Sequence, residues 1–291
     1  MFIVKYKSFF IGLAILLVIA SFALMAKYGI RQGVDFTGGT VIEINYATST
    51  MPTADVQAIE AAGVRVYKLS DGQYRFITQK EYAEAEAAIT SVLNRNSFPY
   101  AETQINTVGP TLGKELTRKA FIAITIVVLA ILSFIAFSFR EVSRPVSSWK
   151  YGVIAMVTLL HDIIVPTGAY VLLSHFYGAE VDTLFVIALL TILGISIADK
   201  IVVFDRIREN LKGGSNKNFE DVVGLSLRQT FTRSVNTSVT VVLALVALYV
   251  FGPATTKFFS LTLMIGMIVG TYSSIFVASP LLTVWNRKGS K

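Results

Sequence analysis

Long uninterrupted apolar runs dominate the pattern of hydrophobic and polar positions along the 291-residue chain. A helix needs roughly 20 apolar residues to cross a hydrocarbon core about 30 Å thick. Runs that meet this requirement occupy residues 9–26, 120–138, 152–174, 183–204, 234–251 and 258–284. A large soluble helical protein would leave so many uncharged runs without a solvated face. The pattern therefore predicts a polytopic α-helical membrane protein with six transmembrane helices.

The first run also needs comparison with a signal peptide, because Lys5 and Lys7 precede it. A run of roughly 18 apolar residues exceeds the usual length of a signal-peptide core. The sequence after Ala26 also lacks a small-residue cleavage site. We expect the run to be retained as the first membrane span.

Residues 28–119, between the first two runs, have the composition of a soluble domain. Alternating and β-branched patterns predict strands, and Asp71-Gly72 is a strong hairpin signal. The expected strands are 40–46, 64–69, 73–78 and 101–108, and the expected helices are 52–63 and 80–94. This βαββαβ order is typical of a ferredoxin-like domain. The sequence thus divides into the first span (1–27), an extracytoplasmic domain (28–119) and a bundle of the remaining spans (120–291).

Two glycine-rich segments bracket that domain, at residues 33–39 and 108–116. Glycine permits tight backbone turns, so either segment can be a simple turn or a functional hinge. The candidate joint residues are Asp35, Gly38, Gly39, Gly109, Pro110 and Gly113. The second segment resembles a phosphate-binding loop, but its glycine spacing is short and no Ser or Thr follows Lys114. We therefore do not expect it to bind ATP.

Ionisable residues inside the apolar runs are the candidates for function. Asp162 lies near the middle of the third run, Asp199 lies inside the fourth, and Arg233 begins the fifth. A charge at membrane depth costs several kcal/mol unless it is paired or hydrated, so such residues commonly serve ion or proton pathways. We expect Asp199 and Arg233 to lie at similar depth, because consecutive spans run in opposite directions. Their pairing would make the protonation of Asp199 switchable.

The neighbours of these residues add two further expectations. Asn236 and Thr237 follow Arg233 at helical spacing, which gives the fifth span a polar stripe that should face the interior of the bundle. Lys200 points roughly 100° away from Asp199 and could reach toward the headgroups. The sequence therefore names Asp199, Arg233, Asp162, Asn236 and Thr237 as candidates for proton transfer.

Charge and composition limit the alternatives. The short connections that are rich in Lys and Arg, at residues 140–150 and 205–233, predict that both termini are cytoplasmic and that residues 28–119 lie outside. The net charge of +7 reflects this bias, so we do not interpret it as nucleic-acid binding. The chain has no cysteine and hence no disulfide or thiol chemistry. No nucleophile–base pair or metal-ligand cluster is evident, so we expect no enzyme activity, no metal and no cofactor.

Several motifs in this order resemble the SecD–SecF protein-export family of the resistance–nodulation–division (RND) superfamily. They are Gly-Val-Asp-Phe-Thr-Gly-Gly at 33–39, Val-Gly-Pro-x-x-Gly-x-Glu-Leu at 108–116, His161-Asp162, and the stretch from Asp199 that ends in Asp-Arg-Ile-Arg-Glu-Asn at 205–210. The resemblance implies a subunit of the bacterial inner membrane that forms a heterodimer with SecD. It also implies action with the SecYEG translocon and its associated small membrane subunits on preprotein substrates, with the proton as coupling ion.

On the family pattern, Asp199 is the proton-carrying acid and Arg233 is its basic neighbour. This sequence departs from the pattern at Ala198, Lys200, Ser234 and Asn236. Two other readings fit the composition: a stand-alone RND-type transporter of a small or lipid-like molecule, and a membrane scaffold without ion flux. A stand-alone transporter with one outer domain would need to homodimerise.

Overall fold

The computed structural model describes residues 2–46, 50–93, 100–138, 148–212 and 218–287. Arg140 and Arg144, which contribute to the predicted orientation, lie outside the described residues. The chain divides into two compact units. Unit 1 comprises residues 1–29, 124–172 and 184–291, and unit 2 comprises residues 30–123 and 173–183. Unit 2 thus includes residues 173–183, which the predicted boundaries place with the bundle.

Unit 2 contains an antiparallel four-stranded sheet with the strand order β2-β3-β1-β4. The short helix α3 (Val34–Thr37) precedes the first strand. The elements then follow as β1 (Gly39–Tyr46), α4 (Thr53–Ala61), β2 (Arg65–Ser70), β3 (Gln73–Thr78), α5 (Tyr82–Leu93) and β4 (Tyr100–Val108). The predicted βαββαβ order is therefore present, with a tight turn at Gly72, whose φ is 73°. The finer assignment of this domain as ferredoxin-like stays a prediction.

The sheet is buried on both faces at β3. On one face, Ile42 and Phe76 are paired across β1 and β3 and join a core that includes Ile59 of α4 and Ile89 of α5. On the other face, directly opposed Glu43 and Arg75 form a buried ion pair at 2.5 Å. A separate and smaller apolar cluster consists of Val34, Ile77 and Val108. Because side chains alternate along a strand, one face of the sheet carries the apolar core and the other face carries the buried ion pair.

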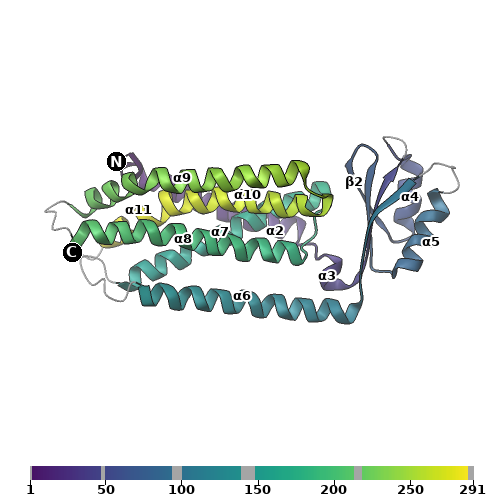
Figure 1. Ribbon diagram of the computed structural model, residues 1–291, viewed down its shortest axis with the longest axis horizontal. Coiled ribbons are helices and arrows are strands. Elements are labelled where there is room, and N and C mark those ends of the chain that lie inside the picture. The colour runs from purple at the N-terminus through teal and green to yellow at the C-terminus, as the bar shows by residue number, and fades with distance from the viewer. Residues whose placement is uncertain (1, 47–49, 94–99, 139–147, 213–217, 288–291) are drawn as a thin grey trace. The chain divides into compact units, whose positions relative to one another are not determined.

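Within the residues that the structure describes, six helices are long and apolar enough to cross a membrane, as predicted. They are α2 (Lys7–Tyr28), α6 (Pro110–Ser138), α7 (Ser148–Tyr177), α8 (Thr183–Lys212), α9 (Phe219–Phe251) and a last span of three parts. The last span runs through α10 (Lys257–Tyr272), the π-helical segment η3 (Ser273–Ala278) and α11 (Ser279–Arg287). Pro166 lies within α7 without ending it. Figure 1 shows α9 and α10 side by side, in agreement with their dense contacts.

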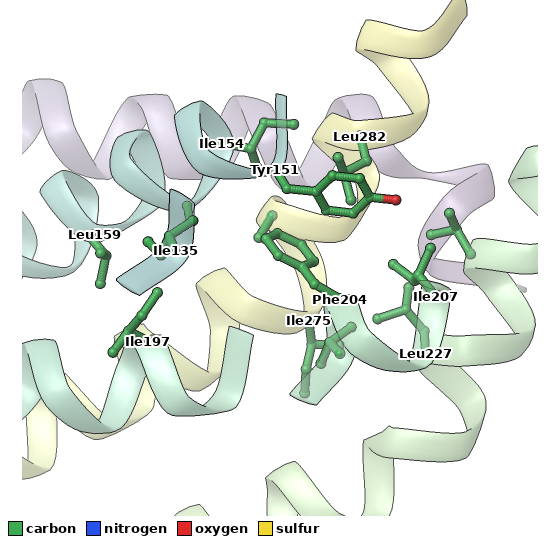
Figure 2. Close-up of a cluster of buried hydrophobic side chains, with 14 of the residues drawn as sticks. Ile135, Tyr151, Ile154, Leu159, Ile197, Phe204, Ile207, Leu227, Ile275 and Leu282 are labelled. Atoms are coloured by element: carbon green, nitrogen blue, oxygen red, sulfur yellow. The ribbon is translucent and has the colours of Figure 1, made fainter. Parts of the chain in front are cut away.

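Close packing holds the bundle together, because lipid tails give helices no hydrophobic drive to associate. In Figure 2, side chains from α6, α7, α8, α9, η3 and α11 meet in one buried cluster, where Tyr151 lies edge-on to Phe204 at 5.3 Å between ring centroids. The glycines of α10 allow close approach elsewhere. A Cβ on Gly266 would lie 2.1 Å from Ile192 Cδ1, and one on Gly270 would lie 3.3 Å from Ser196 Oγ. Helix α8 therefore packs directly on the backbone of α10.

Candidate functional site

An open pocket of about 150 Å³ lies between α8, α9 and α10. Asp199 and Arg233 both line it, so the structure brings together the two residues that the sequence singled out most strongly. The other polar residues of the lining are Ser196, Ser234, Thr237, Ser238 and Thr271. Apolar residues complete the wall. An ionisable acid that lines a pocket within a membrane-spanning helix marks a candidate functional site.

Asp199 is half-buried and makes a single hydrogen bond within the described part of the chain. Its Oδ1 accepts a hydrogen bond of 2.5 Å from Ser234 Oγ. Its Oδ2 is buried without a hydrogen-bond partner among the described residues. A carboxylate oxygen in this state favours a proton, a water molecule or a cation as its next partner.

The prediction that Asp199 and Arg233 form an ion pair is wrong for this structure. No hydrogen bond or ion pair joins the two residues within the described ranges, and Arg233 is exposed. The physical reason is helical geometry, since successive residues point about 100° apart. Ser234 turns toward Asp199 on α8, so Arg233, about 100° around the helix, lies at the edge of the pocket without contacting the carboxylate among the described residues.

The polar stripe of α9 also lies differently from our expectation. Arg233, Asn236, Thr237 and Thr240 are exposed on the surface of the chain rather than inside its own bundle. The inner face of α9 is formed by other residues, including Leu227, Thr230 and Ser234. A polar stripe facing lipid would be costly, so it calls for a protein partner or a water-filled space.

Asp162 lies in a separate buried site. Its side chain has no exposed surface. Oδ2 lies 2.5 Å from Lys200 Nζ, and it accepts hydrogen bonds from Ser196 Oγ at 2.5 Å and from Ser273 Oγ at 2.8 Å. Oδ1 lies 2.9 Å from His161 Nδ1. The site joins α7, α8 and η3.

The expectation that Lys200 reaches the headgroups is wrong. Lys200 is completely buried and is ion-paired with Asp162. Because it lies about 100° around α8 from Asp199, it points into the bundle, where a carboxylate is available. Two opposite charges in neighbouring spans are each costly alone, and this cost is the sequence signal that could have suggested their pairing.

The two glycine-rich joints contact each other within unit 2. A Cβ on Gly38 would lie 2.9 Å from Pro110 Cα, and one on Gly113 would lie 2.9 Å from the Phe36 carbonyl oxygen. Gly39 has φ 131°, and its Cβ would lie 2.2 Å from the Thr78 oxygen. A Cβ on Gly109 would meet nothing within 4 Å. Close backbone packing thus explains why three of these positions are glycine.

The turn between α7 and α8 is bound to the same region, which the sequence did not indicate. Gly33 donates its backbone N–H to Val181 O at 2.8 Å, and Val181 donates to Arg31 O at 2.9 Å. Asp35 Oδ2 accepts the N–H of Thr183, the first residue of α8, at 3.0 Å. These pairs are distant in sequence and carry no local signature.

An ion pair at 2.6 Å between Arg65 and Glu180 adds a charged contact to this turn. Burial raises the pKa of Glu180, and the guanidinium of Arg65 offsets part of that effect. The proton affinity of Glu180 therefore depends on how closely the turn stays against β2. Within the described residues, no group of three or more His, Cys, Asp or Glu side chains could hold a metal ion.

In the described part of the chain, six helices of membrane-spanning length, a mixed α/β domain after the first span and ionisable side chains inside the bundle define a multi-pass membrane protein. Comparison with known proteins identifies the family. The family "Protein export membrane protein SecD/SecF, C-terminal" matches residues 88–288, and the "SecD/SecF GG Motif" matches residues 23–50. The chain belongs to the SecD/SecF protein-export family.

Individual relatives agree along nearly the whole chain. "Protein translocase subunit SecF" of Thermobaculum terrenum is 40% identical, over 98% of this chain and 94% of the relative. "Protein translocase subunit SecDF" of Bacillus subtilis is 32% identical, over 99% of this chain but only 38% of the relative.

The fold is likewise that of a solved family member. The crystal structure of SecDF from Thermus thermophilus, described as a translocon-associated membrane protein, superposes with a TM-score of 0.84 at 29% identity. That match covers 98% of this chain and 38% of the SecDF chain. The chain therefore corresponds to about two fifths of each SecDF protein.

Proposed function

We infer that this chain is an export subunit that pairs with a separate SecD and uses the proton motive force to help complete preprotein translocation. An accessory role in Sec protein export follows from the family. The use of protons, the partner and the translocon contacts are the proposal. SecYEG with its small membrane subunits, and the preproteins that they carry, are the proposed partners, in the bacterial inner membrane with both termini cytoplasmic.

The observation that carries the proton proposal is Asp199. It has one hydrogen bond, one buried oxygen without a partner in the described residues, and a place in the pocket wall. A group that exchanges protons needs access and room for a further partner, and the pocket and the oxygen of Asp199 without a partner in the described residues support this role. Arg233 adds a positive charge to the lining of the same pocket. Thr237 adds a hydroxyl to the lining, whereas Asn236 contributes to the exposed stripe.

Helix α8 supports coupling between the proton site and the outer domain. It runs without interruption from Thr183, which Asp35 binds, to beyond Asp199. Rigid helices transmit small displacements because packed interfaces are bistable rather than continuously deformable. A proton-dependent shift of α8 would therefore act on the turn at residues 178–182 and on the glycine joints beside it.

A second membrane bundle would cover the exposed stripe of α9. Arg233, Asn236 and Thr240 would face this partner rather than lipid. SecD is the natural candidate, since relatives of this chain include SecDF proteins in which the matching portion is 38% of one longer chain. A second copy of this chain, as in a stand-alone transporter, would cover the stripe in a different way.

The proposal is tested by Asp199→Asn in vesicles that contain the chain and its cognate SecD. Proton flux is followed with an enclosed pH-sensitive dye after an imposed pH gradient. We expect the flux to fall at least about tenfold, because a group that accepts the proton is removed. Asp205→Asn is the matched control, as it changes an exposed aspartate on the same helix. Unchanged flux in Asp199→Asn would refute the proton role, and equal flux without SecD would favour the stand-alone transporter.

A further inference from the structure

The ammonium group of Lys200 is enclosed by oxygen atoms from three structural elements. Asp162 Oδ2 of α7 lies at 2.5 Å and Ser273 Oγ of η3 lies at 3.1 Å. Ser196 Oγ, one turn earlier on α8, also accepts a hydrogen bond from it. A lysine ammonium has three N–H donors and no acceptor, so these three oxygens satisfy it fully.

The two serine hydroxyls complete the network. Each one donates to Asp162 Oδ2, Ser196 at 2.5 Å and Ser273 at 2.8 Å. His161 Nδ1 lies 2.9 Å from the other carboxylate oxygen. Lys200, Ser196 and Ser273 have at most 4% of their surface exposed, and Asp162 has none. The carboxylate of Asp162 is thus surrounded by protein groups.

We propose that Lys200 is a tethered cation that fills an oxygen cage formed by Asp162, Ser196 and Ser273, and that this cage closes Asp162 to proton exchange. In this chain Asp162 then joins α7, α8 and the π-helical segment, and Asp199 is the acid that carries protons. The inference rests on the proposed proton role of Asp199. It adds a division of labour between two acids that the sequence names together as candidates for proton transfer.

The contrast between the two carboxylates supports this division. Asp199 lines an open pocket and has an oxygen without a partner in the described residues, whereas Asp162 has partners on both oxygens. Ser196 belongs to both surroundings, because it lines the pocket and binds Asp162. Its hydroxyl is already used as donor and acceptor in the cage, so Ser196 separates the two acids rather than connecting them.

The π-helical segment fits a role for the cage in fixing helix positions. A π-helical turn widens the helix, and such turns are frequent at functional sites. Ser273 is the first residue of η3 and is completely buried. Its bonds to Asp162 and Lys200 hold the last span at the point where its helical geometry changes.

The experiment compares Lys200→Met, Asp162→Asn and the double variant, each purified with the cognate SecD. Each single change leaves a buried partner unsatisfied, so the thermal midpoint should fall by on the order of 10 °C. The double variant removes both charges with little change in volume and should recover most of that loss. In vesicles it should conduct protons as the wild type does, whereas Asp199→Asn does not.

The variants of the charged pair can overturn the proposal in two ways. Either a correctly folded double variant loses proton flux as Asp199→Asn does, or both single variants melt at the wild-type temperature. Ser273→Ala provides a milder variant, since it removes one cage oxygen and keeps both charges. It should conduct normally, and loss of flux in folded Ser273→Ala would equally contradict the cage. Flux retained by Asp199→Asn would instead refute the proposed function itself.

Discussion

Replacing Asp35 by alanine should loosen the start of α8. The Asp35 carboxylate accepts the backbone N–H of Thr183, which begins a helix of 30 residues. Side-chain caps at helix N-termini contribute about 1 kcal/mol, and a negative charge near the helix dipole adds about 0.5 kcal/mol. The loss of about 1.5 kcal/mol corresponds to roughly a tenfold change in a local opening equilibrium.

Amide hydrogen exchange of the turn and the first turn of α8 measures this effect. Peptides that cover residues 178–187 should exchange roughly tenfold faster in Asp35→Ala than in the wild type, if exchange follows the local opening equilibrium. Asp71→Ala is the matched control, because Asp71 has 85% of its side chain exposed and binds only the nearby Lys68 in the described hairpin. Unchanged protection at Thr183 in Asp35→Ala would refute the capping role.

The Asp35→Ala variant also tests whether α8 couples proton transfer to preprotein export. If α8 transmits proton-dependent movement through Thr183, Asp35→Ala should slow preprotein export while proton flux continues. Flux and export would then become separable, whereas we expect Asp199→Asn to lose both. Equal loss of both in a folded Asp35→Ala protein would mean that Asp35 acts on the proton site rather than on its transmission.

Two further predictions concern unit 2. Gly39→Ala should prevent folding of the outer domain, because its Cβ would lie 2.2 Å from the Thr78 oxygen. Gly63→Ala, which has a positive φ of 82° but open space, should cost only about 1–2 kcal/mol by thermal unfolding. Burial raises the pKa of Glu180 above its ordinary value of 4.5, so the folded state binds this proton more tightly than the unfolded state. Wild-type stability should therefore fall relative to Glu180→Gln as pH rises from about 4.5 through the folded-state pKa, and a constant difference between the two melting curves would contradict the shift.

The membrane spans and the order of elements in the outer domain could be predicted, because their signals are local. An apolar run of about 20 residues and an Asp-Gly turn each act within one segment of sequence. The ends of the helices were harder to predict from the sequence. Helix α9 begins at Phe219, before the apolar run at 234–251, because Val222, Val223 and Leu227 pack into the bundle and extend the helix.

The predictions that the structure contradicts share one cause. The partner of Lys200 is 38 residues away, and the residue that binds Thr183 is 148 residues away. Helical periodicity gave the direction of each side chain around its own axis, but not which neighbouring element it meets. The choice of Ser234 rather than Arg233 as the partner of Asp199 depends on the rotation of α9, which packing across the whole helix determines.

The surface of α9 bears on the proposed partner of this chain. Arg233 and Thr237 line the pocket and are exposed on the chain, so the pocket opens on the face where the polar stripe lies. Facing lipid, an arginine and three uncharged polar side chains would be costly, and the pocket would lack a water-filled path. A second bundle against this face would remove the exposed polar stripe of α9 from lipid, which is the physical reason for proposing a partner there.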